Sequence, residues 1–164
     1  TSAIGNKIFK VADSQVSSRW GNISEFENFD LITPNEKEAR FSLADQESNI
    51  EGLSSKLRQS ANYKNLILKL GEKGILCVGN DKKNETFNLG SFSKKVIDAV
   101  GAGDALLAYS TLMLYKTKSL AQASIIGSIA ASCECEIDGN VPIKIDQVLD
   151  KIDQIEKEIK YKKI

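Results

Sequence analysis

The sequence predicts an α/β domain whose central sheet is largely parallel. Apolar runs of strand length alternate with segments of helical spacing in the N-terminal half, and apolar segments of helical length follow in the C-terminal half. Turns that contain Gly or Pro come directly after several predicted strands, which is where parallel sheets bind their ligands. The length of 164 residues is that of one domain and allows a substantial core.

The composition excludes several classes of protein. With 22 basic and 22 acidic residues the formal net charge is zero, so we expect neither a nucleic acid nor a membrane as partner. The chain has no histidine, which excludes histidine-based triads and histidine-ligated metal sites. An odd number of cysteines without a visible secretory segment predicts reduced thiols and a cytoplasmic location. The longest apolar run, near residues 105–115, is too short to cross a bilayer.

The first predicted strands both end in polar residues. Residues 7–13 are expected to form a strand that ends in an aspartate, and residues 29–33 a second strand that a proline stops. A helix is expected to start at Asn35, and Glu38 shares a helix face with Asn35 because the two are three positions apart. Capping of the helix explains this pair; the alternative is a polar pair that orders water around a metal–phosphate group.

The middle of the chain is predicted to hold a helix and a meander of strands. Residues 47–60 carry apolar side chains at helical spacing. Three strands are expected after this helix, at residues 66–70, 75–79 and 85–89. The tight Gly71–Gly74 segment joins the first two of them.

A Gly-rich motif, Asp98–Asp104, precedes a strongly apolar helical segment. Small residues let the backbone approach a ligand, and the first turn of a helix has N–H groups without intrahelical partners, so the motif suits an anion site. A carboxylate at Asp104 suits a base that takes a proton from a hydroxyl attacking a phosphate. The structural alternative is a tight turn with Asp104 as the N-cap or as a first-turn partner of the helix dipole.

Two more helices are expected after this segment. Residues 120–135 are rich in small and apolar side chains and predict close helix packing. The last helix starts at about residue 145 and carries an apolar stripe at helical spacing. The stripe is most simply a face that docks on the body of the protein, and an oligomer contact is the alternative.

Three segments, in this order along the chain, resemble motifs of the ribokinase-like (PfkB) carbohydrate kinases. Residues 96–110 resemble the family's C-terminal signature, Thr33–Ala39 its Asn-x-x-Glu segment and Leu68–Gly74 its strand-turn-strand segment. Within the family, Asp13–Gln15 and Phe29–Asn35 look most like the heptose-phosphate kinases of the ADP-heptose pathway. The resemblance implies a three-layer αβα ribokinase-like fold with a largely parallel central sheet, of which this chain is the C-terminal part only.

The resemblance also implies how phosphoryl transfer would be catalysed. Asp104 would be the catalytic base for the attacking sugar hydroxyl. The amides of Gly101, Ala102, Gly103 and Asp104 would form an anion hole for charge on the transferring group.

Cofactor sites follow from the same resemblance. Asn35 and Glu38 would organise Mg²⁺ and the phosphates of ATP through water. Asp98, with the loop around Gly139, would be a candidate site for a monovalent cation such as K⁺. The residues expected near the nucleotide are Asn35, Glu38, Lys69, Gly71, Gly74 and Asn140.

The chain departs from the family pattern in two ways. Ala99 and Val100 stand where hydroxyl residues are usual, and Tyr109 stands where a small residue is usual. The resemblance covers residues 1–164 as a single partial domain, but this corresponds only to the C-terminal half of a family member. The half that would hold the sugar-binding residues has no counterpart here.

The function implied by the resemblance is ATP-dependent phosphoryl transfer to a hydroxyl of a sugar or sugar phosphate. We expect the chain to be incomplete without an N-terminal sugar-binding half, and this half or a second copy of the chain is the expected protein partner. The alternative is a non-catalytic remnant that binds a nucleotide, or another protein, on a kinase fold.

Overall fold

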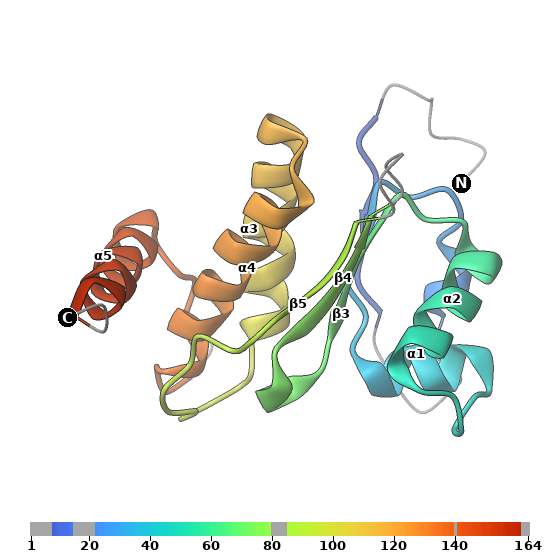
Figure 1. The fold of residues 1–164 in the computed structure, drawn as a ribbon, viewed down its shortest axis with the longest axis horizontal. Coiled ribbons are helices and arrows are strands. Elements are labelled where there is room, and N and C mark those ends of the chain that lie inside the picture. The colour runs from blue at the N-terminus through green and yellow to red at the C-terminus, as the bar shows by residue number, and fades with distance from the viewer. Residues whose placement is uncertain (1–7, 15–21, 80–84, 140, 162–164) are drawn as a thin grey trace. The chain divides into compact units, whose positions relative to one another are not determined.

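The structure is a computed structural model that describes residues 8–14, 22–79, 85–139 and 141–161. The chain divides into two compact units, Thr1–Gly90 and Ser91–Ile164, which we describe one at a time (Figure 1). Asn140, which the sequence predicts near the nucleotide, lies outside the described residues.

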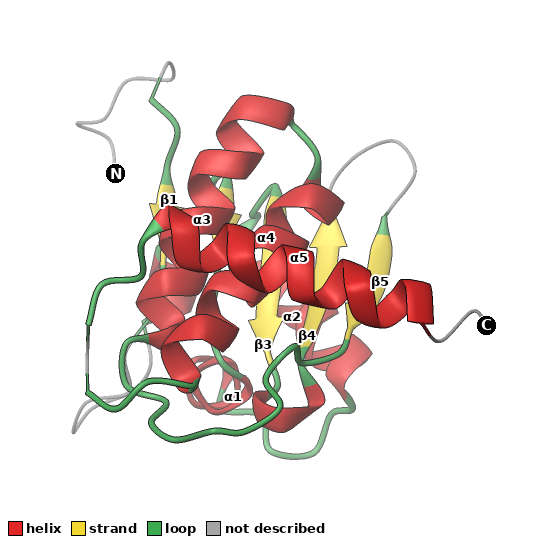
Figure 2. Cartoon of the chain, turned by 90° about the vertical axis from the view of Figure 1, so that its left-hand side faces the viewer, coloured by secondary structure: helices red, strands yellow, loops and turns green. Residues whose placement is uncertain are grey.

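The described part of the first unit holds a five-stranded sheet in the order β1-β2-β3-β4-β5 (Figure 2). The strands are β1 (Val11–Ala12), β2 (Leu31–Ile32), β3 (Asn65–Lys69), β4 (Ile75–Gly79) and β5 (Thr86–Leu89). The neighbours β1, β2 and β3 pair in parallel, and β3, β4 and β5 form the expected antiparallel meander. The pairing changes at β3 because a single 3₁₀ turn, Gly71–Lys73, follows it, and parallel neighbours need a longer crossover. The parallel arrangement predicted for the sheet therefore holds for its first three strands.

The two first strands are shorter than the sequence predicts. Only Val11 and Ala12 of the first predicted strand pair with Leu31 and Ile32 of the second. Just before this ladder the Asp30 carboxylate accepts the Lys10 amide at 2.8 Å, so a side chain replaces the backbone acceptor there, while the Lys10 carbonyl still accepts the Asp30 backbone amide.

Helices α1 (Glu36–Leu43) and α2 (Ile50–Ala61) cover one face of the sheet (Figure 1). Helix α2 begins later than the spacing predicts because Asn49 caps it, its side chain accepting the Gly52 amide at 2.8 Å. Every second residue of β3 enters the core between these layers, as the pleat requires. The largest buried side chains of this core include Leu53, Leu57, Tyr63, Leu66 and Leu68. Each such apolar side chain contributes about 1.5–3 kcal/mol through removal from water.

The second unit consists of helices α3 (Ala102–Thr117), α4 (Leu120–Cys135) and α5 (Ile145–Tyr161) in its described part. Helices α3 and α4 form a hairpin that packs closely at Gly127, because a Cβ there would stand 2.9 Å from the Leu106 carbonyl oxygen. Helix α5 packs Val148, Ile152 and Ile155 of its apolar stripe in one cluster with Ile129 of α4, whereas Leu149 and Ile159 of the stripe are exposed, so docking on the protein holds for part of the stripe.

Tyr109, a departure from the family pattern, fits into this packing. Its ring is half-buried in the apolar cluster of the second unit, and its hydroxyl donates to the Ile143 carbonyl at 2.8 Å. The hydrogen bond ties α3 to the segment before α5, so the larger residue adds a contact.

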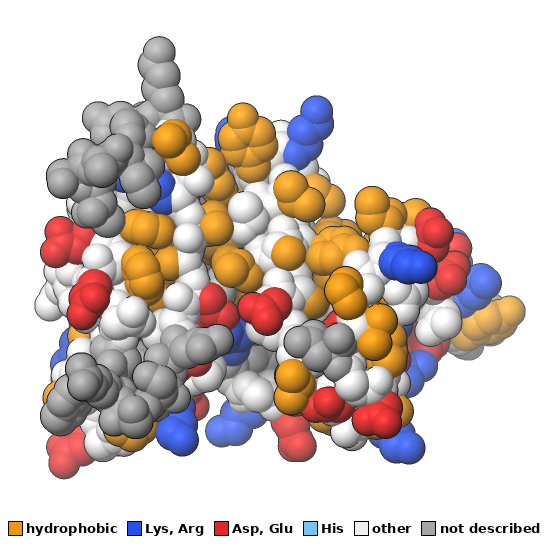
Figure 3. Space-filling model, turned by 180° about the vertical axis from the view of Figure 1, so that it is seen from behind, with side chains coloured by type: hydrophobic (Ala, Val, Ile, Leu, Met, Phe, Trp, Pro, Cys, Tyr) orange, Lys and Arg blue, Asp and Glu red, His pale blue; other side chains and the backbone are white. Residues whose placement is uncertain are grey.

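Apolar side chains also reach the surface of the second unit (Figure 3). The most exposed of them are Val100, Leu112, Tyr115, Ile145, Leu149 and Tyr161. None of the helices in the described ranges is long and apolar enough to span a membrane.

Candidate functional site

Polar side chains gather where the three parallel strands of the first unit end. Asp13 follows β1, Asn35 follows β2, and Lys69 is the last residue of β3. Asn35 and Lys69 form a parallel bridge beyond the named strands, and the Lys69 amide donates to the Pro34 carbonyl at 2.9 Å. The fold thus brings together Asn35 and Lys69, two residues that the sequence predicts near a nucleotide.

Asn35 and Glu38 form a complete capping box at the start of α1. The Glu38 amide donates to the Asn35 side chain at 2.8 Å, and the Asn35 amide donates to the Glu38 carboxylate at 2.7 Å. This confirms the capping interpretation of the pair and fixes the direction of both side chains. Their role toward a metal–phosphate group stays a prediction.

Glu38 is buried, with only 7% of its surface exposed. Burial raises the pKa of its carboxyl group, and the Asn35 amide and the Lys69 ammonium act in the opposite direction. Carboxylate oxygens are suitable ligands for a hard cation.

Asp13 is a member of this cluster that sequence reasoning did not count among the site residues. Its carboxylate lies 2.7 Å from the Lys69 ammonium, and both side chains are about one-fifth exposed. The signal for Asp13 in the sequence is an acidic residue directly after a predicted strand.

Two hydroxyl groups at the same strand ends lack a hydrogen-bond partner. The Ser14 and Thr33 oxygens are buried and unpaired within the described structure. Native structures satisfy most such groups, so their presence here favours a ligand or water at the strand ends.

Gly71 and Gly74 shape the connection from β3 to β4. Both have positive φ, +62° and +88°, and the Leu70 amide donates to the Gly74 carbonyl at 2.8 Å to close the turn. A Cβ on Gly74 would collide with the Leu89 carbonyl oxygen. The turn itself therefore requires these glycines, and their contact with a nucleotide stays a prediction.

In the second unit, the Gly-rich motif forms the start of α3. Gly101 is the N-cap with φ +87°, and the Ala105 amide donates to its carbonyl at 2.9 Å. Ala102, Gly103 and Asp104 make the first turn, whose N–H groups face the free end of the helix. Asp104 is exposed and lies at the third position of the helix. The prediction that it is the N-cap is therefore wrong, and the alternative that it lies in the first turn is confirmed.

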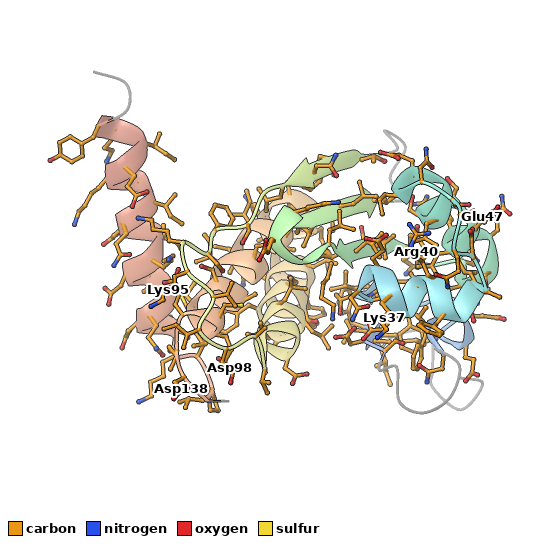
Figure 4. The ribbon with its side chains drawn as sticks, turned by 90° about the horizontal axis from the view of Figure 1, so that it is seen from below. Lys37, Arg40, Glu47, Lys95, Asp98 and Asp138 are labelled. Carbon is orange, nitrogen blue, oxygen red and sulfur yellow. The ribbon has the colours of Figure 1, made fainter. Side chains whose placement is uncertain are left out.

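Asp98 lies in the loop that precedes α3, and Asp138 in the turn that follows α4 (Figure 4). The Asp98 carboxylate accepts the Val100 amide at 2.9 Å, and the Asp98 and Ile97 amides donate to the Cys135 carbonyl. Within the described ranges, no three His, Cys, Asp or Glu side chains form a group that could hold a metal ion. The monovalent-cation site stays a prediction.

The three cysteines form no disulfide within the described residues and serve as packing residues. Cys77 and Cys133 are buried, and Cys135 is half-buried. Burial raises the pKa of Cys133 and of Cys135, which keeps these thiols protonated at neutral pH.

The sequence profile of the pfkB family of carbohydrate kinases matches residues 5–141. The chain belongs to this family. Among curated members, the bifunctional protein HldE of Helicobacter acinonychis is 29% identical over 133 residues, which are 79% of this chain and 28% of that protein. The HldE protein of Campylobacter curvus is 32% identical over 120 residues, 71% of this chain and 25% of that protein. The resemblance to heptose-phosphate kinases within the pfkB family agrees with these relatives.

Solved structures give the fold of the family. The ribokinase of Thermotoga maritima is 27% identical, with a TM-score of 0.72 over 87% of this chain and 48% of that chain. The Arabidopsis thaliana ribokinase solved with ribose and ATP has a TM-score of 0.71 at 20% identity. Phosphofructokinase-2 of Escherichia coli, solved with potassium, has a TM-score of 0.70 at 21% identity. The chain has the ribokinase-like fold and spans about half the length of these structures, and about a quarter of the HldE proteins.

Proposed function

We propose that residues 1–164 are the nucleotide-binding and catalytic part of an ATP-dependent kinase for a sugar or sugar phosphate. The observation that carries the proposal is the start of α3, where Gly101 turns the backbone and Asp104 stands exposed in the first helical turn. Membership of the pfkB family supports a carbohydrate as the phosphate acceptor. The HldE relatives make a heptose phosphate the first acceptor to test.

In the proposed reaction, the acceptor hydroxyl oxygen attacks the γ-phosphorus of ATP. A new oxygen–phosphorus bond forms, the bond from the γ-phosphorus to the bridging oxygen breaks, and ADP leaves with the bonding electrons. Asp104 takes the hydroxyl proton, and the backbone amides of Gly101 to Asp104 stabilise negative charge on the transferring group. Asp104 suits this step because its side chain is exposed, whereas Glu38 is buried and already accepts the Asn35 amide.

The strand-end cluster of the first unit fits the Mg²⁺ and nucleotide sites that the family implies. Mg²⁺ binds one or two carboxylates together with phosphates and water, and Glu38 provides a carboxylate of this kind. When bound, Mg²⁺ would neutralise charge on the polyphosphate. Lys69, Gly71 and Gly74 would lie near the nucleotide, and Asp98 would contribute to a K⁺ site beside the anion hole.

Asp104→Asn tests the catalytic role of this carboxylate in the chain supplied with an N-terminal sugar-binding half. Because Asn keeps the shape and cannot accept the proton, we expect nucleotide affinity to stay within about twofold while turnover falls about 10²–10⁴-fold. The readout is acceptor-dependent ADP release together with calorimetry. Near-normal turnover would remove Asp104 from the role of base.

The second candidate is a non-catalytic nucleotide-binding remnant. Ala99 and Val100, which stand where the family usually has hydroxyl residues, favour it. Binding of Mg·ATP without acceptor-dependent ADP release, in the presence of an N-terminal sugar-binding half, would support the remnant over the kinase.

A further inference from the structure

The ion pair between Asp13 and Lys69 has a fixed geometry. One Asp13 carboxylate oxygen lies 2.7 Å from the Lys69 ammonium, and the other accepts the Ser14 amide at 2.9 Å. Both carboxylate oxygens are therefore engaged, and the ammonium is held over the ends of β1 and β3.

A second ion pair, near the opposite end of β3, provides a comparison. Lys64, just before β3, lies 2.7 Å from Asp30, but its side chain is 64% exposed against 19% for Lys69. The exposed Lys64 ammonium is screened by solvent and contributes little to the order around it, although Asp30 itself is only 13% exposed. The Lys69 pair is instead partly removed from water, next to the buried Glu38 and the unpaired Ser14 and Thr33 hydroxyls.

The charges of the cluster set which ligand it accepts. Two carboxylates, Asp13 and Glu38, surround one ammonium, Lys69, so the ionised cluster carries one net negative charge. A bare polyphosphate is repelled by this charge, although Lys69 offers it hydrogen bonds. A divalent cation reverses the sign of the charge and lets the same polyphosphate bind.

We propose that Asp13 is a positioning residue of this site: it holds the Lys69 ammonium toward the phosphates and, through its charge, makes nucleotide binding depend on the divalent cation. The inference rests on the proposed nucleotide site of the first unit and concerns its regulation by charge. Lys69 is the group that Asp13 acts through, and Glu38 supplies the remaining negative charge.

Calorimetry with ADP tests the proposal on the whole chain, in Mg²⁺ and in EDTA. The quantity of interest is the ratio of the metal-free to the Mg²⁺ dissociation constant. We expect Asp13→Asn to lower this ratio about tenfold, because it removes one negative charge, and Lys69→Met to raise it by a similar factor. Asp13→Glu keeps the charge, so it should keep the ratio while weakening Mg·ADP binding through the altered ion-pair geometry.

Lys64→Met is the matched control, since it breaks an ion pair of the same length at the other end of β3. It should leave both dissociation constants unchanged. Circular dichroism of each variant checks that the chain is folded, and Lys69→Met decides the matter should Asp13→Asn fail to fold.

The outcomes separate the two proposals. No ADP binding by the natural chain in either condition would overturn the nucleotide site and with it the role of Asp13. ADP binding with an unchanged ratio in Asp13→Asn or in Lys69→Met would overturn the role of Asp13 and leave the nucleotide site standing.

Discussion

Glu38→Gln is expected to stabilise the chain at neutral pH and to remove part of its pH dependence. Burial is the largest cause of the raised pKa of Glu38, so the folded state holds this proton more tightly than the unfolded chain does. The contribution of Glu38 to stability is therefore complete below the unfolded pKa of about 4.5 and is lost as pH rises through the folded pKa. Glutamine keeps the side-chain oxygen that accepts the Asn35 amide and carries no charge to desolvate.

Glu38→Ala measures how much the capping hydrogen bond contributes to the free energy of unfolding, separately from the effect of the charge. Alanine removes the acceptor at 2.7 Å from the Asn35 amide and should cost about 1 kcal/mol. With a slope of about 2 kcal/mol per molar urea, that cost lowers the unfolding midpoint by about 0.5 M. The glutamine variant should show no such loss, since its capping box stays intact.

Urea unfolding followed by circular dichroism, in EDTA at about pH 4 and about pH 8, measures both effects. The glutamine variant should match the natural chain near pH 4 and exceed it near pH 8. A glutamine variant as unstable as the alanine variant near pH 8, or a difference from the natural chain that does not change with pH, would refute the reasoning.

Two further predictions concern the packing of each unit. Gly74→Ala forces a Cβ into the Leu89 carbonyl at φ +88° and should cost about 3 kcal/mol, whereas Gly71→Ala meets open space and should cost about 1 kcal/mol; equal shifts of the urea midpoint would contradict the steric argument. Tyr109→Phe removes the hydrogen bond to the Ile143 carbonyl and should cost about 1 kcal/mol, with nucleotide affinity unchanged; thermal unfolding and calorimetry measure the two quantities, and unaltered stability would show that the hydroxyl bond has no net worth.

Much of the fold could be predicted from the sequence because its signals are local. The capping box spans Asn35 to Glu38, and the β3–β4 turn depends on two glycines. The same holds for α3, where a Gly-Ala-Gly run and an apolar segment predict a helix with an open first turn. The Gly101 residue is the N-cap of this helix, and Asp104 lies at its third position.

The lengths of the first two strands could not be predicted from local sequence signals. The apolar runs at residues 7–13 and 29–33 have the composition of longer strands. A residue belongs to a strand only where the backbone of a neighbouring strand provides its hydrogen-bond partners. The Asp30 side chain, rather than a backbone carbonyl, accepts the Lys10 amide before the ladder begins. Which strands pair, and over how many residues, is a property of the assembled sheet.

The features of the candidate site also fall into two groups, those that local sequence predicts and those that depend on the tertiary structure. The sequence by itself determined the pfkB motifs, the Asn35–Glu38 cap and the Gly-rich start of α3, because each depends on residues within a few positions of one another. Only the tertiary structure decided that Asp13 pairs with Lys69 across 56 residues and that Glu38 is buried beside them. Ion pairing and desolvation depend on distances through space, and the order of the parallel strands sets those distances.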